Sequence, residues 1–226
     1  MITETPSFKR FGTREDAGRA LAKRLQKFIA APDAVVLGLP KGGVVVGIEI
    51  ARRLCLPFDV LLVAKITMPG CGDTPLGAIT SGGVRMLNSA MIDRLHLSDE
   101  EIHNAVLKES IELARREHAY RSDRPSIDVA DRTVILVDDG GSSCSTLRNS
   151  IRLLRRQHAE HVVVALPATC HHAACDLRME ADEVITLAEP SADVPASRWF
   201  ENFTPPSTED IRRILRAAPL PEDAMN

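Results

Sequence analysis

The chain has 226 residues, of which 44% are hydrophobic, so it is long enough to enclose one well-filled core. Its formal net charge of -3 and its pI near 6.2 lack the basic excess typical of nucleic-acid-binding proteins. Five cysteines at irregular positions do not make a disulfide framework, no apolar run is long enough to span a membrane, and no secretion signal is visible. We therefore expect a single cytoplasmic domain over residues 1–226, with reduced thiols and no nucleic-acid or membrane partner.

The amino-terminal part predicts a helix that packs on the core. Thr13 and Asp16 have the spacing of a capping box, in which two side chains satisfy backbone N–H groups of the first turn. Apolar residues then recur at helical spacing, at Ala17, Leu21, Leu25 and Phe28. We assign the neighbouring cations to a solvated face: Arg10, Arg14 and Arg19.

A buried strand is predicted over residues 34–39, and a helix is predicted over residues 44–54. The turn between them contains Lys41 followed by the pair Gly42 and Gly43. Glycines between a strand and a helix let the backbone approach an anion, and a lysine adds a positive charge. The turn therefore favours a phosphate group, although an ordinary tight turn has the same composition.

The next apolar run, residues 58–64, predicts a second strand with Lys65 at its carboxyl end. If the sheet is parallel, Lys65 lies on the same edge as the preceding turn. Residues 66–87 have the composition of a loop that merges into a β-hairpin, and long loops of this kind often serve as lids. Residues 88–128 predict a helical insertion, whose long helix starts with a cap and acidic residues at 98–101.

The most specific stretch is residues 134–147. Four aliphatic residues predict a strand buried on both faces, which ends in Asp138 and Asp139 and a turn rich in glycine and serine. A helix is predicted to begin near Ser145 or Thr146. Its unpaired N–H groups and the nearby glycines and hydroxyls form an anion site, whereas carboxylates accept bonds from sugar hydroxyls and favour a divalent cation. The stretch suits a phosphorylated sugar with Mg²⁺.

Other interpretations of this stretch account for less of the sequence. Receiver domains also contain a hydrophobic run followed by acids, but near their start, whereas a long α/β segment comes first here. A nucleophile elbow has the pattern Gly-x-Ser-x-Gly, and Cys144 stands where its last glycine belongs. An ordinary strand-to-helix turn with capping serines stays open as an alternative.

Residues 162–166 and 183–187 predict two further strands, with a helix from 171 to 179 between them. Cys170, His171, His172 and Cys175 raise the question of a zinc site at the start of this helix. Only His171 and Cys175 share a helical face, which argues against that site.

The tail, residues 190–226, contains the only tryptophan of the chain, Trp199, followed by Phe200. These rings either hold the tail against the core or offer a stacking surface to a ligand. A final helix is predicted after a cap at Ser207.

Residues 134–147 resemble the signature of the type I phosphoribosyltransferases, which has four hydrophobic residues, two acids and a loop usually ending Thr-Gly-x-Thr. The signature binds 5-phosphoribosyl-1-pyrophosphate (PRPP). The resemblance implies that Asp138 and Asp139 hold the ribose hydroxyls, with Mg²⁺ nearby. It also implies a 5′-phosphate cradle of Gly140, Gly141, Ser142, Ser143, Cys144, Ser145 and Thr146. Ser143 replaces the usual threonine, and Cys144 replaces the usual glycine. The Cβ of Cys144 costs roughly 1–2 kcal/mol if the loop needs a left-handed backbone at this position.

The resemblance extends over most of the chain, to a bacterial phosphoribosyltransferase-like subgroup of unassigned substrate. It implies an α/β fold: a central, largely parallel sheet flanked by helices, with a flexible β-hairpin lid and the helical insertion. It places Lys41, Gly42 and Gly43 on the pyrophosphate and implies that Lys65 faces it. It also makes the tail a hood, in which Trp199 or Phe200 stacks on a base.

The implied activity is transfer of the 5-phosphoribosyl group from PRPP, with Mg²⁺, to a nitrogen nucleophile such as a nucleobase or related heterocycle, with release of pyrophosphate. The catalytic candidates are Asp138, Asp139 and Lys65. One alternative is a PRPP- or nucleotide-binding regulatory protein with little or no turnover. It is motivated by Cys144 and by the lid, where residues 71–75 depart from the sequence that is usual in the subgroup. Another is an RNA-binding regulator that uses Arg148, Arg152, Arg155 and Arg156. The acceptor and the formation of a homodimer stay open.

Overall fold

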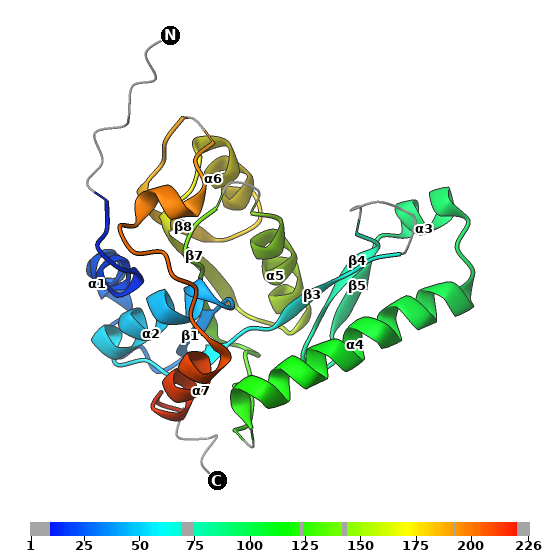
Figure 1. Ribbon diagram of the computed structural model, residues 1–226, viewed down its shortest axis with the longest axis horizontal. Helices are drawn as coiled ribbons and strands as arrows, with labels where there is room; N and C mark the ends of the chain where they lie inside the picture. The colour runs from blue at the N-terminus through cyan, green and yellow to red at the C-terminus, as the bar shows by residue number, and fades with distance from the viewer. Residues whose placement is uncertain (1–9, 69–74, 123, 142–143, 192, 221–226) are drawn as a thin grey trace.

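The computed structural model describes residues 10–68, 75–122, 124–141, 144–191 and 193–220. A five-stranded parallel sheet forms its centre, in the order β2 (Phe58–Val60), β1 (Ala34–Gly38), β6 (Thr133–Val137), β7 (His161–Ala168) and β8 (Glu183–Ala188). A separate antiparallel sheet contains β3 (Val63–Ile66), β4 (Gly77–Thr80) and β5 (Arg85–Leu87). Figure 1 shows the two sheets side by side.

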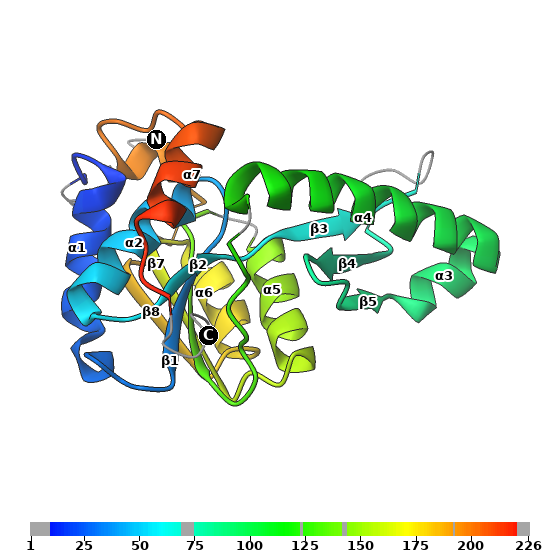
Figure 2. The ribbon, with the colours of Figure 1, turned by 90° about the horizontal axis from the view of Figure 1, so that it is seen from below.

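Helices cover both faces of the parallel sheet (Figure 2). On one face lie α1 (Arg14–Arg24), α2 (Gly42–Leu54) and α7 (Thr208–Arg216), and on the other α5 (Ser145–Arg156) and α6 (His171–Arg178). Residues 134–137 of β6 have no exposed surface, and they alternate between the two cores. The prediction of a strand buried on both faces, within an α/β fold with a largely parallel sheet, is therefore confirmed.

The helical insertion contains α3 (Ser89–Leu95) and the long helix α4 (Asp99–Arg121). Both extend away from the parallel sheet and lie along the antiparallel one (Figures 1 and 2). Two short 3₁₀ helices, η1 (Gln26–Phe28) and η2 (Ala196–Trp199), complete the described elements. The expected hairpin is confirmed as β4 and β5, which turn at residues 81–84, whereas the rest of the expected lid, residues 69–74, lies outside the described residues.

The predicted single strand over residues 58–64 is wrong, because this apolar run crosses from one sheet to the other. Leu61 N still donates to Gly38 O of β1 at 3.1 Å, whereas Leu62 O accepts from Ser81 N of the hairpin at 3.3 Å. Both leucines are buried at the crossing. An unbroken apolar sequence therefore reports burial and does not show where a chain changes partner strands.

Three helices begin at the caps that the sequence predicted, and each cap is a capping box. Thr13 and Asp16 cap α1, Ser98 and Glu101 cap α4, and a third pair, Ser207 and Asp210, caps α7.

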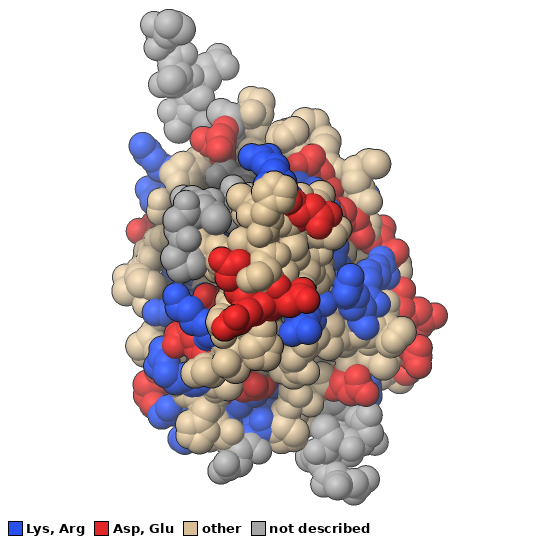
Figure 3. Space-filling model, turned by 90° about the vertical axis from the view of Figure 1, so that its right-hand side faces the viewer, with Lys and Arg blue, Asp and Glu red and all other residues tan. Residues whose placement is uncertain are grey.

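Within the described ranges, no helix combines the length and the apolarity needed to cross a lipid bilayer. On the face shown in Figure 3, acidic and basic side chains are interspersed, with acidic groups near the centre.

The arginines of α5, on which the RNA-binding alternative rests, face acidic partners. Arg148 and Arg152 both bind Glu180, with shortest N–O distances of 2.8 and 2.7 Å. Arg155 pairs with Asp182, and Arg156 donates to a backbone carbonyl in β5. These pairs neutralise much of the positive charge that would attract a phosphate backbone, so the structure weakens that alternative.

Candidate functional site

Two loops meet at the carboxyl edge of the parallel sheet. Asp138 and Asp139 directly follow β6, and the turn at 40–43 follows its neighbour β1. Gly43 packs on the backbone here: an added Cβ would lie 2.4 Å from Val137 O and 2.9 Å from Asp138 Cα. Parallel strands end at the same edge, so the predicted meeting of these turns is confirmed.

Gly42 packs directly on the acid pair. A Cβ at this position would lie 1.8 Å from Asp139 Oδ2 and 2.7 Å from Arg14 Nε, distances at which atoms overlap. The absence of a side chain at Gly42 therefore leaves the space that the Asp139 carboxylate and its partner Arg14 occupy.

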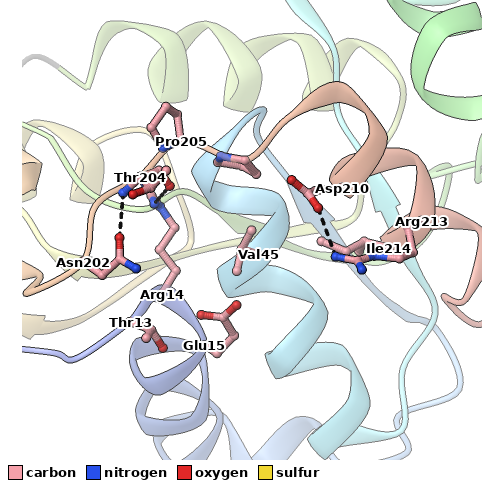
Figure 4. A pocket seen from close by; sticks show the side chains of 11 residues that line it. Thr13, Arg14, Glu15, Val45, Asn202, Thr204, Pro205, Asp210, Arg213 and Ile214 are labelled. Atoms are coloured by element: carbon pink, nitrogen blue, oxygen red, sulfur yellow. Dashed lines mark hydrogen bonds and ion pairs between the residues drawn. The ribbon is translucent and has the colours of Figure 1, made fainter.

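Arg14, assigned from the sequence to a solvated face, is buried at the site instead. Its Nε donates to Asp139 Oδ2 at 2.8 Å, and its Nη1 donates to Thr204 O at 2.9 Å. Its guanidinium also lies 4.0 Å from the centre of the Phe203 ring. Figure 4 shows Arg14 reaching from α1 to the tail segment. The tail covers Arg14 and makes it a link between residues 202–204 and the acid pair.

The assignment failed because the partners of Arg14 are remote in sequence. The tail lies along the start of α1: Phe11 N donates to Trp199 O, and Glu201 N donates to Phe11 O, both at 2.8 Å. No local pattern around Arg14 marks this contact. The only sequence clue is its place directly after the cap Thr13, where a cation is unfavourable near the positive end of the helix dipole.

Burial and the negative charge of Asp139 raise the pKa of Asp138 to about 8, although the cation Arg14 opposes this shift. Asp138 Oδ1 accepts a hydrogen bond from Asp139 N at 3.0 Å. The raised pKa favours the protonated form of Asp138 in the ligand-free protein, next to the Asp139 carboxylate that is paired with Arg14. Together the two groups can both donate and accept hydrogen bonds, which suits a pair of sugar hydroxyls.

We expect Asp138→Asn to stabilise the ligand-free protein at alkaline pH. The raised pKa means that the folded state binds more protons than the unfolded state between about pH 4 and 8, so Asp138 lowers stability as pH rises through this window. Asparagine removes the charge and keeps the acceptor oxygen. Thermal melts should show similar Tm values at pH 4 and a variant at least about 5 °C more stable at pH 8. A constant Tm difference across this range would contradict the prediction.

The turn after the acid pair is held to the end of β7. Gly140 has φ of +106°, and a Cβ there would lie 2.6 Å from Ala168 O. Gly141 O accepts a hydrogen bond from Thr169 Oγ1 at 2.8 Å. Ser142 and Ser143 lie outside the described residues. Ser145 and Thr146 form the start of α5, whose first N–H groups have no acceptor within the helix.

Cys144, which stands where the family usually has glycine, has a left-handed backbone conformation. Its φ is 43° and its ψ 12°, and it is the residue before α5. The side chain is buried, with Sγ 3.4 Å from Thr169 Oγ1, and burial raises the pKa of the thiol. The backbone thus has the conformation that favours glycine, while the cysteine side chain packs beside Thr169.

The structure separates the two predicted lysines. Lys41 is exposed in the turn beside the acid pair, and its peptide bond with Pro40 is cis. Lys65 lies within β3, where it pairs with Ala78 of β4. The prediction that Lys65 closes a parallel strand is therefore wrong, because β3 belongs to the antiparallel sheet. Lys41 is the lysine that the sheet topology brings next to the acids.

Trp199 and Phe200 are buried and do not offer ring faces to a base. Phe200 has no exposed surface and Trp199 is 5% exposed. The centre of the Phe200 ring lies 5.8 Å from that of Phe11 and 5.3 Å from that of Phe203. Trp199 and Phe200 belong to a small core that also includes Ala17 and Ala168. The stacking prediction is wrong for this structure, and the alternative, an aromatic plug that holds the tail, is the arrangement observed.

A cavity of about 300 Å³ lies beside Arg14, between α1, α2 and the tail. Its lining combines apolar, polar and charged side chains (Figure 4): Val45, Pro205, Pro206, Ile214, Thr13, Asn202, Thr204, Glu15, Asp210 and Arg213. Arg14 therefore has the acid pair on one side and an open space under the tail on the other.

Comparisons with known proteins identify a sequence family and a similar fold. The sequence profile described as "Phosphoribosyl transferase domain" matches residues 12–197. Two curated proteins, "Putative phosphoribosyl transferase Rv0571c" of Mycobacterium tuberculosis strain H37Rv and its counterpart MT0597 of strain CDC 1551, are each 36% identical over 210 residues. Each alignment covers 93% of this chain and 47% of the relative, so the chain spans about half the length of the curated relatives it matches.

One solved structure is similar over nearly its whole length. The crystal structure of TT1426 from Thermus thermophilus has a TM-score of 0.81 and 32% sequence identity, and the match covers 92% of this chain and 98% of that chain. The parallel sheet, the antiparallel hairpin and the helical insertion thus form an arrangement that another protein shares.

Proposed function

The chain belongs to the phosphoribosyl transferase domain family, and on this basis we propose that it transfers the 5-phosphoribosyl group of PRPP to a nitrogen nucleophile. The observation that carries the proposal is the packing of Gly42 against Asp139. It joins a turn suited to pyrophosphate with carboxylates suited to ribose hydroxyls in one site.

In the proposed complex, Asp138 and Asp139 bind the ribose 2′- and 3′-hydroxyls. Residues 140–146 and the first N–H groups of α5 hold the 5′-phosphate at the positive end of the helix dipole. Lys41 and the N–H groups of residues 42–43, at the start of α2, hold the pyrophosphate.

The proposed reaction breaks the bond between C1 and the pyrophosphate oxygen and forms a bond between C1 and the acceptor nitrogen. The electron pair of the broken bond leaves with pyrophosphate, and the proton of the acceptor nitrogen passes to solvent or to the leaving group. Positive charge develops on the ribose ring in the transition state. Asp138 and Asp139, which lie beside the ring in the proposed complex, stabilise this charge, and Lys41 stabilises the departing anion.

Magnesium fits this site together with the substrate. Among the described residues, no group of three or more His, Cys, Asp or Glu side chains is arranged to hold a metal ion. Asp139 also has one oxygen bonded to Arg14. Mg²⁺ commonly binds one or two carboxylates plus substrate phosphates, so Asp138 and Asp139 would hold it jointly with oxygens of PRPP. The bound ion would supply neutralisation of the pyrophosphate charge.

Calorimetric titration of PRPP with Mg²⁺ tests the site. We expect the wild type to bind and the double variant Asp138→Asn with Asp139→Asn to bind at least about 100-fold more weakly, because the carboxyl contacts to the ribose hydroxyls and to Mg²⁺ are lost. Asp131→Asn is the matched control: Asp131 is exposed and has φ of 56°, which asparagine also tolerates, so PRPP binding should not change. Equal binding by the double variant and the wild type would contradict the proposed site.

A second function, PRPP binding with little or no turnover, follows from the left-handed Cys144. We expect Cys144→Gly to keep PRPP affinity within about tenfold of the wild type, because the backbone is already left-handed in the ligand-free structure and its cost is the same before and after binding. Pyrophosphate release with a panel of nucleobases then separates the two functions. Release by the wild type supports the transferase, whereas tight PRPP binding without release by either protein supports the binding protein.

A further inference from the structure

A second cavity, of about 410 Å³, lies beside the acid pair on the side of the helical insertion. The turn after β1, the start of β3, the last turns of α4 and the start of α7 surround it. Figures 1 and 2 show this end of α4 next to α7. Lys41 lines the cavity, and the next residue, Gly42, packs on Asp139. The cavity therefore borders the proposed PRPP site and shares Lys41 with it.

The charged groups that line this cavity are mostly positive. Lys41, Arg115 and Arg116 are cations, and Glu112 is the single anion among them. The two arginines hold the pKa of Glu112 down to about 2, so it is ionised. Two positive charges are left in excess, the number that a phosphate monoester dianion would balance.

Both arginines have hydrogen-bond donors left after they bind Glu112. Arg115 uses Nε and Nη2 at 2.8 and 2.9 Å, and Arg116 uses Nε at 2.8 Å. A guanidinium carries five N–H donors, so each arginine can bind a further anion without releasing Glu112.

Tyr120 adds a polar group that lacks a hydrogen-bond partner among the described residues. It lines the cavity and is 8% exposed, and its hydroxyl makes no hydrogen bond to the described part of the chain. The hydroxyl oxygen is not among the fully buried polar atoms that lack a partner, so it is open to a ligand in the cavity. Leu62, Val63, Leu113 and Ala119 form an apolar wall near this group.

We propose that this cavity binds an organic phosphate monoester with an apolar group, and that this ligand competes with PRPP. The phosphate would lie against Lys41, Arg115 and Arg116, and the apolar group would lie against the wall formed with Tyr120. Competition follows because Lys41 lines the cavity and also belongs to the proposed pyrophosphate turn. In this respect the inference rests on the proposed function, and the cavity is an inhibitory site next to it.

Phenyl phosphate is a suitable probe because it has an aromatic ring and a dianionic phosphate but no ribose. Calorimetry should show that it binds the wild type, and that benzoate, which has the same ring and one charge, binds at least about tenfold more weakly. Arg115→Gln with Arg116→Gln should weaken phenyl phosphate at least about tenfold and leave PRPP binding unchanged. Tyr120→Phe should weaken it about threefold.

Lys108→Gln is the matched control, since Lys108 is exposed on the same helix outside the cavity, and phenyl phosphate should bind this variant as it binds the wild type. The Asp138→Asn, Asp139→Asn variant should also keep phenyl phosphate while losing PRPP, so the cavity can be confirmed even if the PRPP site fails. If phenyl phosphate does not bind the wild type, or binds the arginine variant as tightly as the wild type, the proposed binding site in the cavity is wrong. Binding that PRPP with Mg²⁺ does not weaken would overturn the competition.

Discussion

Gly42→Ala is expected to weaken PRPP binding at least about 100-fold while the protein stays folded. The added Cβ would lie 1.8 Å from Asp139 Oδ2, so the carboxylate must leave its place beside Arg14. Alanine is otherwise favourable here, because Gly42 begins α2 and alanine has the higher helix propensity. The added methyl group therefore displaces the Asp139 carboxylate without weakening the helix that it belongs to. Calorimetry with PRPP and Mg²⁺, together with a thermal melt, measures both quantities.

Gly82→Ala is the control for this prediction. Gly82 has φ of +92° in the turn between β4 and β5, and an added Cβ would meet no atom within 4 Å. Alanine there should cost about 1 kcal/mol through backbone strain alone and leave PRPP binding unchanged. If Gly42→Ala bound PRPP as tightly as Gly82→Ala, the packing of the glycine turn on Asp139 would have no role in the site.

Arg14→Met is expected to lower both the free energy of unfolding and the affinity for PRPP. The side chains of Arg14 and Asp139 are only 7% and 15% exposed, so methionine leaves a largely buried carboxylate without its cation. Breaking such a pair costs about 3 kcal/mol, or roughly 6–12 °C in Tm. PRPP affinity should fall at least about tenfold, because Asp139 loses the group that orients it.

Arg14→Lys separates charge from geometry in this prediction. Lysine keeps the positive charge but cannot donate from one planar group to both Asp139 and Thr204 O, so we expect only partial recovery of stability and PRPP affinity. Arg19→Met is the matched control on the same helix: its pair with Asp16 is 42% exposed on each side, so its loss should cost no more than about 0.5 kcal/mol. An Arg14→Met variant as stable as Arg19→Met would show that the buried pair does not hold the tail to the acid pair.

The sequence by itself determined those parts of the site that depend on neighbours along the chain. The aliphatic run of β6, the acids after it and the start of α5 follow one another within residues 134–147, and each has a local physical cause. The capping boxes of α1, α4 and α7 are likewise contacts across a single turn. The meeting of the two turns was also predictable, because parallel strands end at one edge.

Only the tertiary structure decided the contacts that join remote segments. Arg14 meets Asp139 across 125 positions in sequence and Thr204 across 190, and no periodicity encodes such distances. Lys65 and the rings of Trp199 and Phe200 differ from their predictions for a related reason. Apolar and aromatic residues specify that a segment is buried, but the segment that buries it is chosen by the packing of the whole chain, which decides the strand's sheet and the position of the tail.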